Sequence, residues 1–321
     1  MLEKCRRGQW SVDDLDWDVP PRPMSRYEEE RIVQYFTDMS GIERLAKALF
    51  MEQQRRVEDP VLAEIFATFV ADEERHAVAA ERLARHYDVH RYRVYQTNPA
   101  LVAFRPVFID AIKLLTAEFA NLYITTGELL LDMALLRGLS DYVDDEMCRR
   151  VMRLVNRDEA RHIAVDYHMF GYYAAPEYQA RMRAEMRRPL RHHARAVVSF
   201  AQVLYYAAPF VQNIFTEPLR MVDPSNRHMR AAFKRIQLLG RKPELAARPF
   251  ARFLRLVQLG YNAPVLGRVF GSIFTRIAGV PGDALEIHYD RREEQQARRM
   301  SYDEHVRATF AANGLRLASS V

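Results

Sequence analysis

The sequence has few of the features that stabilise or target secreted proteins. Only two of its 321 residues are cysteines, Cys5 and Cys148, and two cysteines cannot form a disulfide framework. The first ten residues, MLEKCRRGQW, lack the apolar run of a secretory signal peptide. We therefore expect a protein of the reducing cytoplasm.

Glycine is scarce, with 12 residues, and stretches that alternate apolar and polar side chains are nearly absent. Apolar residues instead recur at spacings of three and four, which is the pattern of amphipathic helices. The chain is 49% hydrophobic and 28% charged, so it can bury a large core. This combination predicts an all-α protein.

Proline, glycine and aspartate punctuation predicts four long helices, over 25–57, 60–87, 106–137 and 144–173. These helices would form a four-helix bundle, preceded by an N-terminal arm, within residues 1–175. Residues 176–321 would form an additional C-terminal helical extension. Since no linker-like segment separates the two parts, we expect the extension to pack on the bundle and not to be an independent domain.

The charge pattern does not indicate nucleic-acid binding, although the net charge is +5 and the pI is near 9.2. The basic residues are almost all arginines, and they are interleaved with acidic residues along helical stretches. A basic face would suit an acidic electron donor such as a ferredoxin, or an acyl-carrier protein.

Two apolar stretches raise the question of a membrane. Residues 196–216 carry no charge and are long enough to span a bilayer, but they contain serine, glutamine, asparagine and proline. We therefore expect a buried core helix there. Residues 249–279 are amphipathic and cationic. We expect this stretch to pack within the protein, and the alternative interpretation is docking to a partner or peripheral contact with a membrane.

The most informative pattern is the motif Asp-Glu-x-Arg-His, which occurs at residues 72–76 and again at residues 158–162. Residues three apart share one face of a helix, so Glu73 with His76, and Glu159 with His162, can each present a carboxylate and an imidazole to a metal ion. The duplication predicts a site for two metal ions.

Two further carboxylates are expected from the partner helices. Glu43 and Glu73 are 30 residues apart, and the Asp59-Pro60 turn lies near their midpoint, so they face each other at one height. Glu128 stands in a similar relation to Glu159, although the turn signal at 138–140 is off-centre. The competing candidates for these two ligands are Glu52 and Glu118.

This ligand set predicts the metal and its supporting residues. Four carboxylates and two imidazoles, without a thiolate, suit iron or manganese and not a structural zinc. Asp72 and Asp158 can each accept from the N–H of a ligand imidazole, while Arg75 and Arg161 hold these aspartates.

These residues resemble the ferritin-like di-iron carboxylate superfamily, specifically the ribonucleotide reductase small-subunit-like group that includes ligand-binding manganese/iron oxidases. The resemblance covers residues 1–172 and includes the segment KCRRGQWSVDDLDWD, which is similar to the tryptophan-containing arm of that group. It implies a ferritin-like four-helix bundle. It also implies an electron path through Trp10, Asp158 and His76, for which Trp17 is a competing start.

The departures from that group are informative too. Ala80 stands where a radical-generating subunit has its tyrosine, and Val155 stands where arylamine oxygenases add a histidine. The resemblance therefore implies a ligand-binding oxidase or oxygenase and not a tyrosyl-radical subunit. Asp132, one turn after Glu128, is a candidate proton donor, and Tyr123 occupies the position of a tyrosine that forms an ether cross-link, with Leu45 as the conceivable partner.

We therefore expect an enzyme, a non-haem di-iron oxygenase or oxidase that uses O2 to hydroxylate or desaturate an apolar or acyl-type small molecule, and that forms a homodimer. The alternatives are a manganese/iron ligand-binding oxidase or ribonucleotide reductase small-subunit-like protein, a ferroxidase or iron-storage protein, and a metal-stabilised interaction module. The substrate pocket is expected among apolar side chains on the helix faces nearest the metals: Phe36, Phe50, Phe66, Phe69, Ile124, Leu131, Met152 and Ile163.

Overall fold

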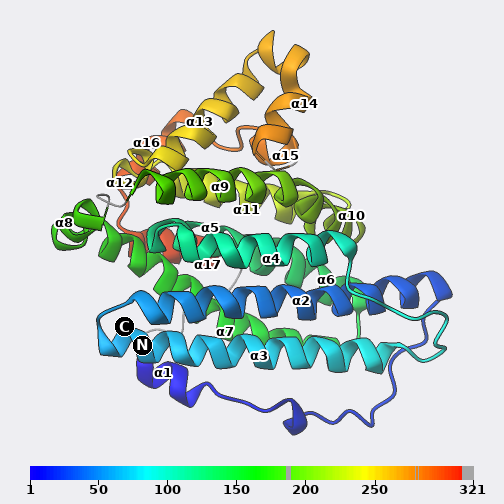
Figure 1. Cartoon of the computed structure of the whole chain (residues 1–321). Helices are drawn as coiled ribbons and strands as arrows, with labels where there is room; N and C mark the ends of the chain where they lie inside the picture. Colours follow the sequence, from blue (N-terminus) through cyan, green and yellow to red (C-terminus); the bar gives the residue numbers. More distant parts are fainter. Residues whose placement is uncertain (186–188, 279, 281, 313–321) are drawn as a thin grey trace.

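The chain is helical along most of its length (Figure 1). The computed structural model describes residues 1–185, 189–278, 280 and 282–312. Those residues contain no β-strand, so the predicted all-α class is confirmed for the described part of the chain.

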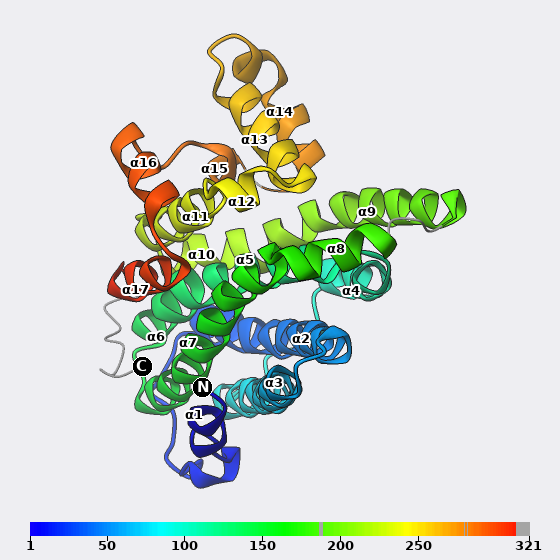
Figure 2. The ribbon, with the colours of Figure 1, turned by 90° about the vertical axis from the view of Figure 1, so that its left-hand side faces the viewer.

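Four helical rods make up the half of the molecule that carries the duplicated motif (Figure 2). The helices are α2 (Arg26–Arg56), α3 (Pro60–Tyr87), α5 (Ala117–Leu130) and α7 (Glu146–Ala174). Helix α2 packs along α3, and α5 packs along α7. Contacts of α2 with α5 and of α3 with α7 complete a helical bundle. Three of these helices begin within two residues of their predicted starts.

Local capping explains why those starts are predictable. Ser25 and Glu28 exchange side-chain to backbone hydrogen bonds at the start of α2, and Asp59 accepts from two backbone N–H groups at the start of α3. Asp145 caps α7 and also accepts from the hydroxyl of Tyr87 at 2.8 Å. The last contact fixes the end of α3 against the start of α7.

The prediction of one helix over 106–137 is wrong. The chain forms α4 (Pro99–Leu114), breaks at Leu115, and starts α5 with Thr116 as its N-cap. Helix α4 lies outside the bundle and packs against the extension. Thr116 accepts from the backbone N–H of Phe119, a capping signal that a continuous apolar pattern conceals.

The turn expected at residues 138–140 is also absent. Helix α5 continues as a π-helix, η2 (Leu131–Leu136), and then as α6 (Arg137–Val143), so the turn consists of Asp144 and Asp145 alone. Gly138 lies within α6, where a Cβ atom would stand 2.8 Å from Cγ2 of Val222. This glycine permits close helix packing and does not mark a turn.

The N-terminal arm runs across the outer side of the bundle. Helix α1 (Leu2–Arg7) packs on α3, and the short 3₁₀ helix η1 (Val12–Asp14) follows it along the same helix. The arm passes so close to α7 that a Cβ on Gly8 would stand 2.7 Å from Nη1 of Arg161. A larger residue at position 8 would push the arm away from the motif.

The C-terminal extension consists of short helices around one longer helical rod. Its helices are α8 (Pro176–Glu185), α9 (Leu190–Phe210), the π-helix η3 (Val211–Thr216), α10 (Glu217–Val222), α11 (Arg227–Leu239), α12 (Pro243–Ala246), α13 (Pro249–Asn262), α14 (Leu266–Ala278), α15 (Gly282–Leu285), α16 (Arg291–Arg299) and α17 (Tyr302–Ala312).

The extension shares its core with the bundle. Helix α9 packs on α4, α11 on α5 and η2, and α17 on α7. Buried side chains of the extension, such as Phe210, Phe233 and Phe310, belong to the same hydrophobic cluster as those of the bundle. A second, small cluster joins α13, α14 and α15, and of these α13 and α14 project from the rest of the molecule (Figure 1).

The apolar stretch that includes residues 196–216 lies in one rod, Leu190–Val222, formed by α9, η3 and α10. By length and composition this is the one helix in the described part of the chain that could cross a membrane. Only 22% of its most apolar window is buried, so the expectation of a buried core helix is wrong for most of its surface.

Candidate metal centre

The structure brings the six predicted ligands together between the four bundle helices. Two groups of side chains each place one ligand atom per residue within 4.8 Å of the others. One group comprises Glu43, Glu73, His76 and Glu159, and the second comprises Glu73, Glu128, Glu159 and His162. Because Glu73 and Glu159 belong to both groups, the six side chains could hold two neighbouring ions.

Each helix contributes to the site as its local sequence requires. Glu43 comes from α2 and Glu128 from α5, while each Glu-x-x-His pair lies on one face of α3 or α7. All six side chains are at least 97% buried. The turn that follows Glu128 is not at residues 138–140, because η2 and α6 continue the helical rod as far as Val143.

Most carboxylate oxygens of the four glutamates have no hydrogen-bond partner within the described part of the chain. Both carboxylate oxygens of Glu43, both of Glu73 and Oε2 of Glu128 have no hydrogen-bond donor among the described residues. Such groups are costly to bury unless something else satisfies them. A bound cation would do so, and its ligands would be the oxygen and nitrogen donors that iron and manganese accept.

Burial and mutual repulsion shift the acidity of these groups. Burial, and then the neighbouring Glu73, raises the pKa of Glu43 well above its usual range. Burial and Glu159 do the same to the pKa of Glu128. Burial lowers the pKa of His76, but its contacts with Asp158 and Glu159 outweigh this and raise it well above the usual range. The cluster therefore retains protons unless cations replace them.

Each histidine is oriented by the aspartate of the other motif. His76 Nε2 lies 3.2 Å from Oδ2 of Asp158, and His162 Nε2 lies 3.3 Å from Oδ2 of Asp72. The Nδ1 atoms therefore face the glutamates, with His76 Nδ1 3.1 Å from Oε1 of Glu159. An Nε2–H that donates to an aspartate leaves the Nδ1 lone pair free for a metal ion.

The two motif arginines neutralise these aspartates. Arg161 donates to Asp158 at 2.7 Å and lies 3.3 Å from Asp72. Arg75 forms an ion pair with Asp72 and lies 3.7 Å from Asp158. Burial would raise the pKa of Asp158, but His76 and Arg161 lower it far below its usual range. Both aspartates are thus held ionised beside the ligand histidines.

The N-terminal arm extends this network toward the surface. The indole Nε1 of Trp10 donates to Oδ2 of Asp158 at 2.8 Å, so Trp10, Asp158 and His76 form a continuous hydrogen-bonded chain. The guanidinium of Arg75 lies 5.4 Å from the centroid of the Trp10 ring. The competing Trp17 donates to the backbone oxygen of Val12 instead.

The sequence pattern did not identify Gln9. Its side chain donates a hydrogen bond to Asp72, as the indole of Trp10 donates one to Asp158. Gln9 Nε2 donates to Oδ1 of Asp72 at 3.0 Å, and Gln9 Oε1 accepts from Arg75 at 2.8 Å. Its position next to Trp10 in the arm was the available signal.

Asp166 was missed as well. It follows His162 by one helical turn, is fully buried, and neither of its carboxyl oxygens has a hydrogen-bond partner among the described residues. Burial raises its pKa well above the usual range. The four-residue spacing after His162 places it on the metal-facing side of α7 and could have indicated it.

The rival ligands lie elsewhere and are paired with arginines. Glu52 forms ion pairs with Arg55 and Arg56, and Glu118 forms one with Arg248.

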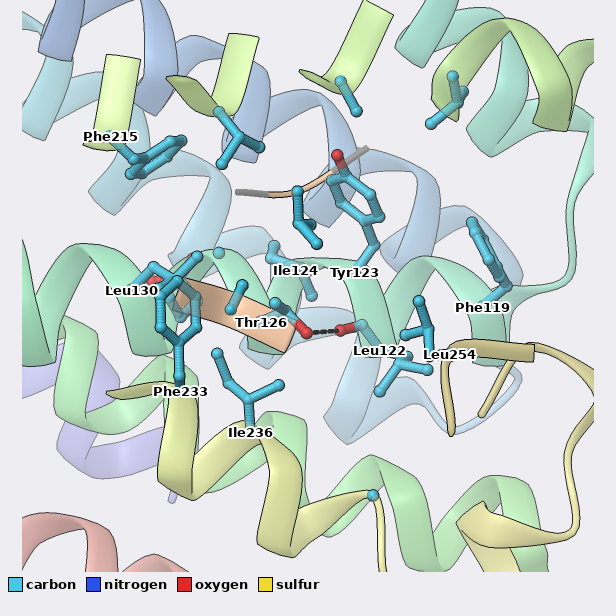
Figure 3. A pocket seen from close by; sticks show the side chains of 18 of the residues that line it. Phe119, Leu122, Tyr123, Ile124, Thr126, Leu130, Phe215, Phe233, Ile236 and Leu254 are labelled. Carbon is cyan, nitrogen blue, oxygen red and sulfur yellow. Dashed lines mark hydrogen bonds between the residues drawn. The ribbon is translucent and has the colours of Figure 1, made fainter. Parts of the chain in front are cut away.

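An apolar cavity of about 260 Å³ begins beside Glu128 and extends away from the other ligands. It is lined by α2, α4 and α5 of the N-terminal half and by α9, η3, α11, α13 and α15 of the extension. Figure 3 shows Ile124, Leu130, Phe233 and Ile236 turned into this space. The hydroxyl of Thr126 donates a hydrogen bond to the backbone oxygen of Leu122 at 2.8 Å.

The predicted pocket residues are only partly found there. Ile124 and Leu131 line the cavity, but Phe36, Phe66, Met152 and Ile163 do not. Phe50 and Phe69 pack on the ring of His162, with centroid distances of 5.1 and 4.2 Å. The cavity opens toward the extension, whose contribution the sequence pattern did not indicate.

The two predicted catalytic residues have different outcomes. Tyr123 lines the cavity, as does Leu45, and burial raises the pKa of the Tyr123 hydroxyl. Asp132 lies in η2, and its side chain is outside the described residues.

Comparison with known proteins gives no family. No protein-family model, no curated protein and no solved structure matches the chain.

Proposed function

We propose that the chain is a ferritin-like di-metal carboxylate protein, a non-haem di-iron oxygenase or oxidase that uses O2 to hydroxylate or desaturate an apolar or acyl-type small molecule. The observation that carries this proposal is the pair of four-residue ligand groups that share Glu73 and Glu159.

Charge balance supports two divalent ions. Four ionised glutamates carry four negative charges, which two divalent cations neutralise. Asp72 and Asp158 are separately neutralised by Arg75 and Arg161. Without the cations the four glutamates would form an uncompensated buried cluster, which the fold could hold only by keeping protons there.

A bound pair of ferrous ions would supply the electrons and the Lewis acidity needed to reduce dioxygen. The chain's own residues provide the rest. Asp72 and Asp158 hold protons on the Nε2 atoms of the histidines, and Phe50 and Phe69 shield His162 from water. Asp166 holds a carboxyl proton one turn from His162, and the cavity beside Glu128 receives an apolar substrate.

Electrons would enter through Trp10, Asp158 and His76, since these residues form a hydrogen-bonded chain that runs from an aromatic side chain of the arm to a ligand. The net charge of +5 suits an acidic donor such as a ferredoxin, or an acyl-carrier protein that presents the substrate. A homodimer is part of the same proposal.

The test is anaerobic loading with Fe(II), followed by a pulse of oxygen, with oxygen uptake, absorbance and products recorded. An oxygenase takes up two ions per chain, consumes oxygen and forms an oxidised product. Growth of an iron mineral would indicate storage, and no reaction would indicate a structural site. Metal analysis of protein from its native host distinguishes di-iron from a manganese/iron pair.

A further inference from the structure

A buried arginine without a counter-ion lies at the end of the apolar cavity that is remote from the ligands. Arg241 is 7% exposed and lines the cavity together with Gln258, which is 6% exposed. Its guanidinium donates to the hydroxyl of Tyr289 at 2.7 Å and to Oε1 of Gln258 at 2.5 Å. No ion pair joins it to a carboxylate of the described residues, and its two hydrogen-bond acceptors are both neutral.

Burying a guanidinium without an anion is unfavourable, so this group is suited to bind one. Arg255, one turn before Gln258 on α13, adds a second arginine to the same lining, and within the described part of the chain it forms no ion pair. Arginine presents a planar set of donors that matches carboxylate and phosphate groups. The remote end of the cavity is therefore a candidate anion site.

The position of this site relative to Glu128 determines the orientation of a ligand. Figure 3 shows side chains of α5, among them Leu122 and Leu130, and side chains of α11, Phe233 and Ile236, all lining the same cavity. From Phe233 to Leu239 helix α11 advances six residues, or about 9 Å, toward Arg241. The walls between the two ends are mostly aliphatic and aromatic. Of the two hydroxyl-bearing side chains labelled in Figure 3, Tyr123 and Thr126, the hydroxyl of Thr126 donates to the backbone.

We propose that this cavity binds a single-chain amphiphile, with its anionic head at Arg241 and Gln258 and its apolar tail directed to Glu128. The proposal rests on the proposed function only for the fate of the tail, since binding itself requires no oxygen chemistry. It places the oxidised position of the substrate near the tail end and away from the head.

Binding is measured by calorimetry on the full chain loaded with zinc, which is redox-inert, so that a failure here is separate from a failure of oxygen chemistry. Hexadecanoate is expected to bind more tightly than hexadecanol, and Arg241→Gln is expected to weaken hexadecanoate about 10- to 100-fold. Arg299→Gln, an exposed arginine on α16, is the matched control. Hexadecyl phosphate determines whether the head is a phosphate or a carboxylate.

A second pair of variants tests the orientation. A Cβ on Gly127 meets no atom within 4 Å, because that position faces the cavity beside Glu128. Gly127→Leu should therefore weaken hexadecanoate strongly and octanoate little, since the shorter acid ends before this point, while Gly127→Ala should change neither. Equal binding of acid and alcohol, or unchanged binding in Arg241→Gln, would overturn the proposal. Equal loss of both acids in Gly127→Leu would overturn the orientation.

An independent observation concerns the outer surface of the projecting hairpin α13–α14. Several of its large apolar side chains are exposed, including Leu256, Val265, Val269 and Ile273, of which Val269 is 62% exposed. Residues 249–278 contain four arginines and no acidic residue. Three of these arginines, Arg252, Arg268 and Arg276, are exposed.

We infer that this hairpin docks on an anionic lipid bilayer. Exposed apolar side chains among arginines suit insertion at the level of lipid headgroups, and the absence of acids on the hairpin avoids repulsion from anionic lipids. A second copy of the chain is a poorer occupant, since its own hairpin would oppose arginines to arginines.

The probe is co-sedimentation of the full chain with vesicles of phosphatidylcholine, with and without phosphatidylglycerol. Binding should require the anionic lipid, fall with added salt, and drop at least tenfold in Val269→Asp/Ile273→Asp. Val94→Asp, an exposed valine far from the hairpin in sequence, is the control. Equal binding to neutral vesicles, or a dimer that the hairpin variant converts to a monomer without any vesicle binding by the parent, would overturn the inference.

Discussion

The imidazole of His162 is held by Asp72, a residue that precedes it by 90 positions and belongs to the other motif, at 3.3 Å from Nε2 to Oδ2. His76 and Asp158 repeat this relation at 3.2 Å. The two motifs are therefore interdependent. Each supplies a glutamate and a histidine to the ligand cluster, and each also supplies the aspartate that orients the histidine of the other motif.

Asp72→Asn should weaken one metal position selectively. An asparagine cannot provide the negative charge that holds the N–H of His162, so the affinity of the ion bound by His162 should fall about 10- to 100-fold. Metal titration with separate detection of the two ions measures this. Glu74→Gln, on the same helix but paired with Lys47, is the control and should change neither affinity.

Loss of a ligand should have a larger effect. Glu128→Ala or His162→Ala should abolish binding at one position and, with it, the uptake of oxygen. Glu118→Ala removes a carboxylate from the same helix α5 that is paired with Arg248, and should leave both ions in place. Two bound ions and normal oxygen uptake in the His162 variant would show that the ligand assignment is wrong.

Trp10→Phe should separate electron delivery from metal binding. Phenylalanine keeps an aromatic ring but loses the N–H that donates to Asp158, so the metal content should remain and the rate of reduction should fall. Stopped-flow reduction by a chemical donor and by a ferredoxin measures that rate. Trp17→Phe, which loses only a contact to a backbone oxygen, should reduce at the parental rate.

The metal-free protein should lose stability as the pH rises. Burial raises the folded-state pKa of Glu43 and Glu128 above the value of about 4.3 in an unfolded chain, so ionisation is more costly in the folded state. Their contribution is complete below about pH 4.3 and is lost as the pH rises toward the folded-state pKa. The raised pKa of His76 acts in the same direction above about pH 6.5.

Thermal unfolding of chelator-treated protein between pH 5 and pH 8 tests this sign. Glu43→Gln should unfold at a higher temperature than the parent at pH 8 and should show a weaker dependence on pH. The metal-loaded parent should show little dependence over the same range, because the cations compensate the ionised carboxylates. A metal-free parent that gains stability toward pH 8 would contradict the expected direction.

Gly138→Ala should destabilise the fold by about 1–3 kcal/mol through overpacking against Val222. Gly271→Ala is the matched helical control, since the nearest atom to its added Cβ is Cε2 of Tyr261 at 3.6 Å, an ordinary contact. It should be neutral or stabilise by up to about 1 kcal/mol. Urea unfolding of both variants measures the difference.

The sequence predicted the parts of the fold whose signals are local. Ser25, Asp59 and Asp145 each cap a helix through contacts within three residues, and those three helix starts were found. Helical periodicity also placed each glutamate beside its histidine. The third bundle helix was predicted wrongly because its apolar pattern continues across the break at Leu115, where α4 turns away to pack on α9.

The contacts that the residues alone did not establish are those between distant segments. In the sequence Gly138 indicates a turn. Only the structure shows that it permits close packing against Val222, a residue 84 positions later. The pairing of His162 with Asp72 depends on how α3 and α7 are rotated about their own axes, which spacing within either helix does not specify. The remote wall of the cavity likewise comes from α11 and α13, whose positions depend on tertiary packing.

The π-helical segment Leu131–Leu136 changes the directions in which side chains point before and after it along the rod that carries Glu128. Each residue of an α-helix turns the chain by about 100°, and the wider π-turn accommodates one residue more than an α-helical turn does, so the same residues wound as a regular α-helix would rotate the two halves of the rod against each other by roughly that angle. Either the carboxylate of Glu128 would leave the cluster or Gly138 would leave Val222. The extra residue in the π-turn thus lets one continuous rod place Glu128 in the ligand cluster and Gly138 against Val222 at the same time, which a regular helix of the same length would not do.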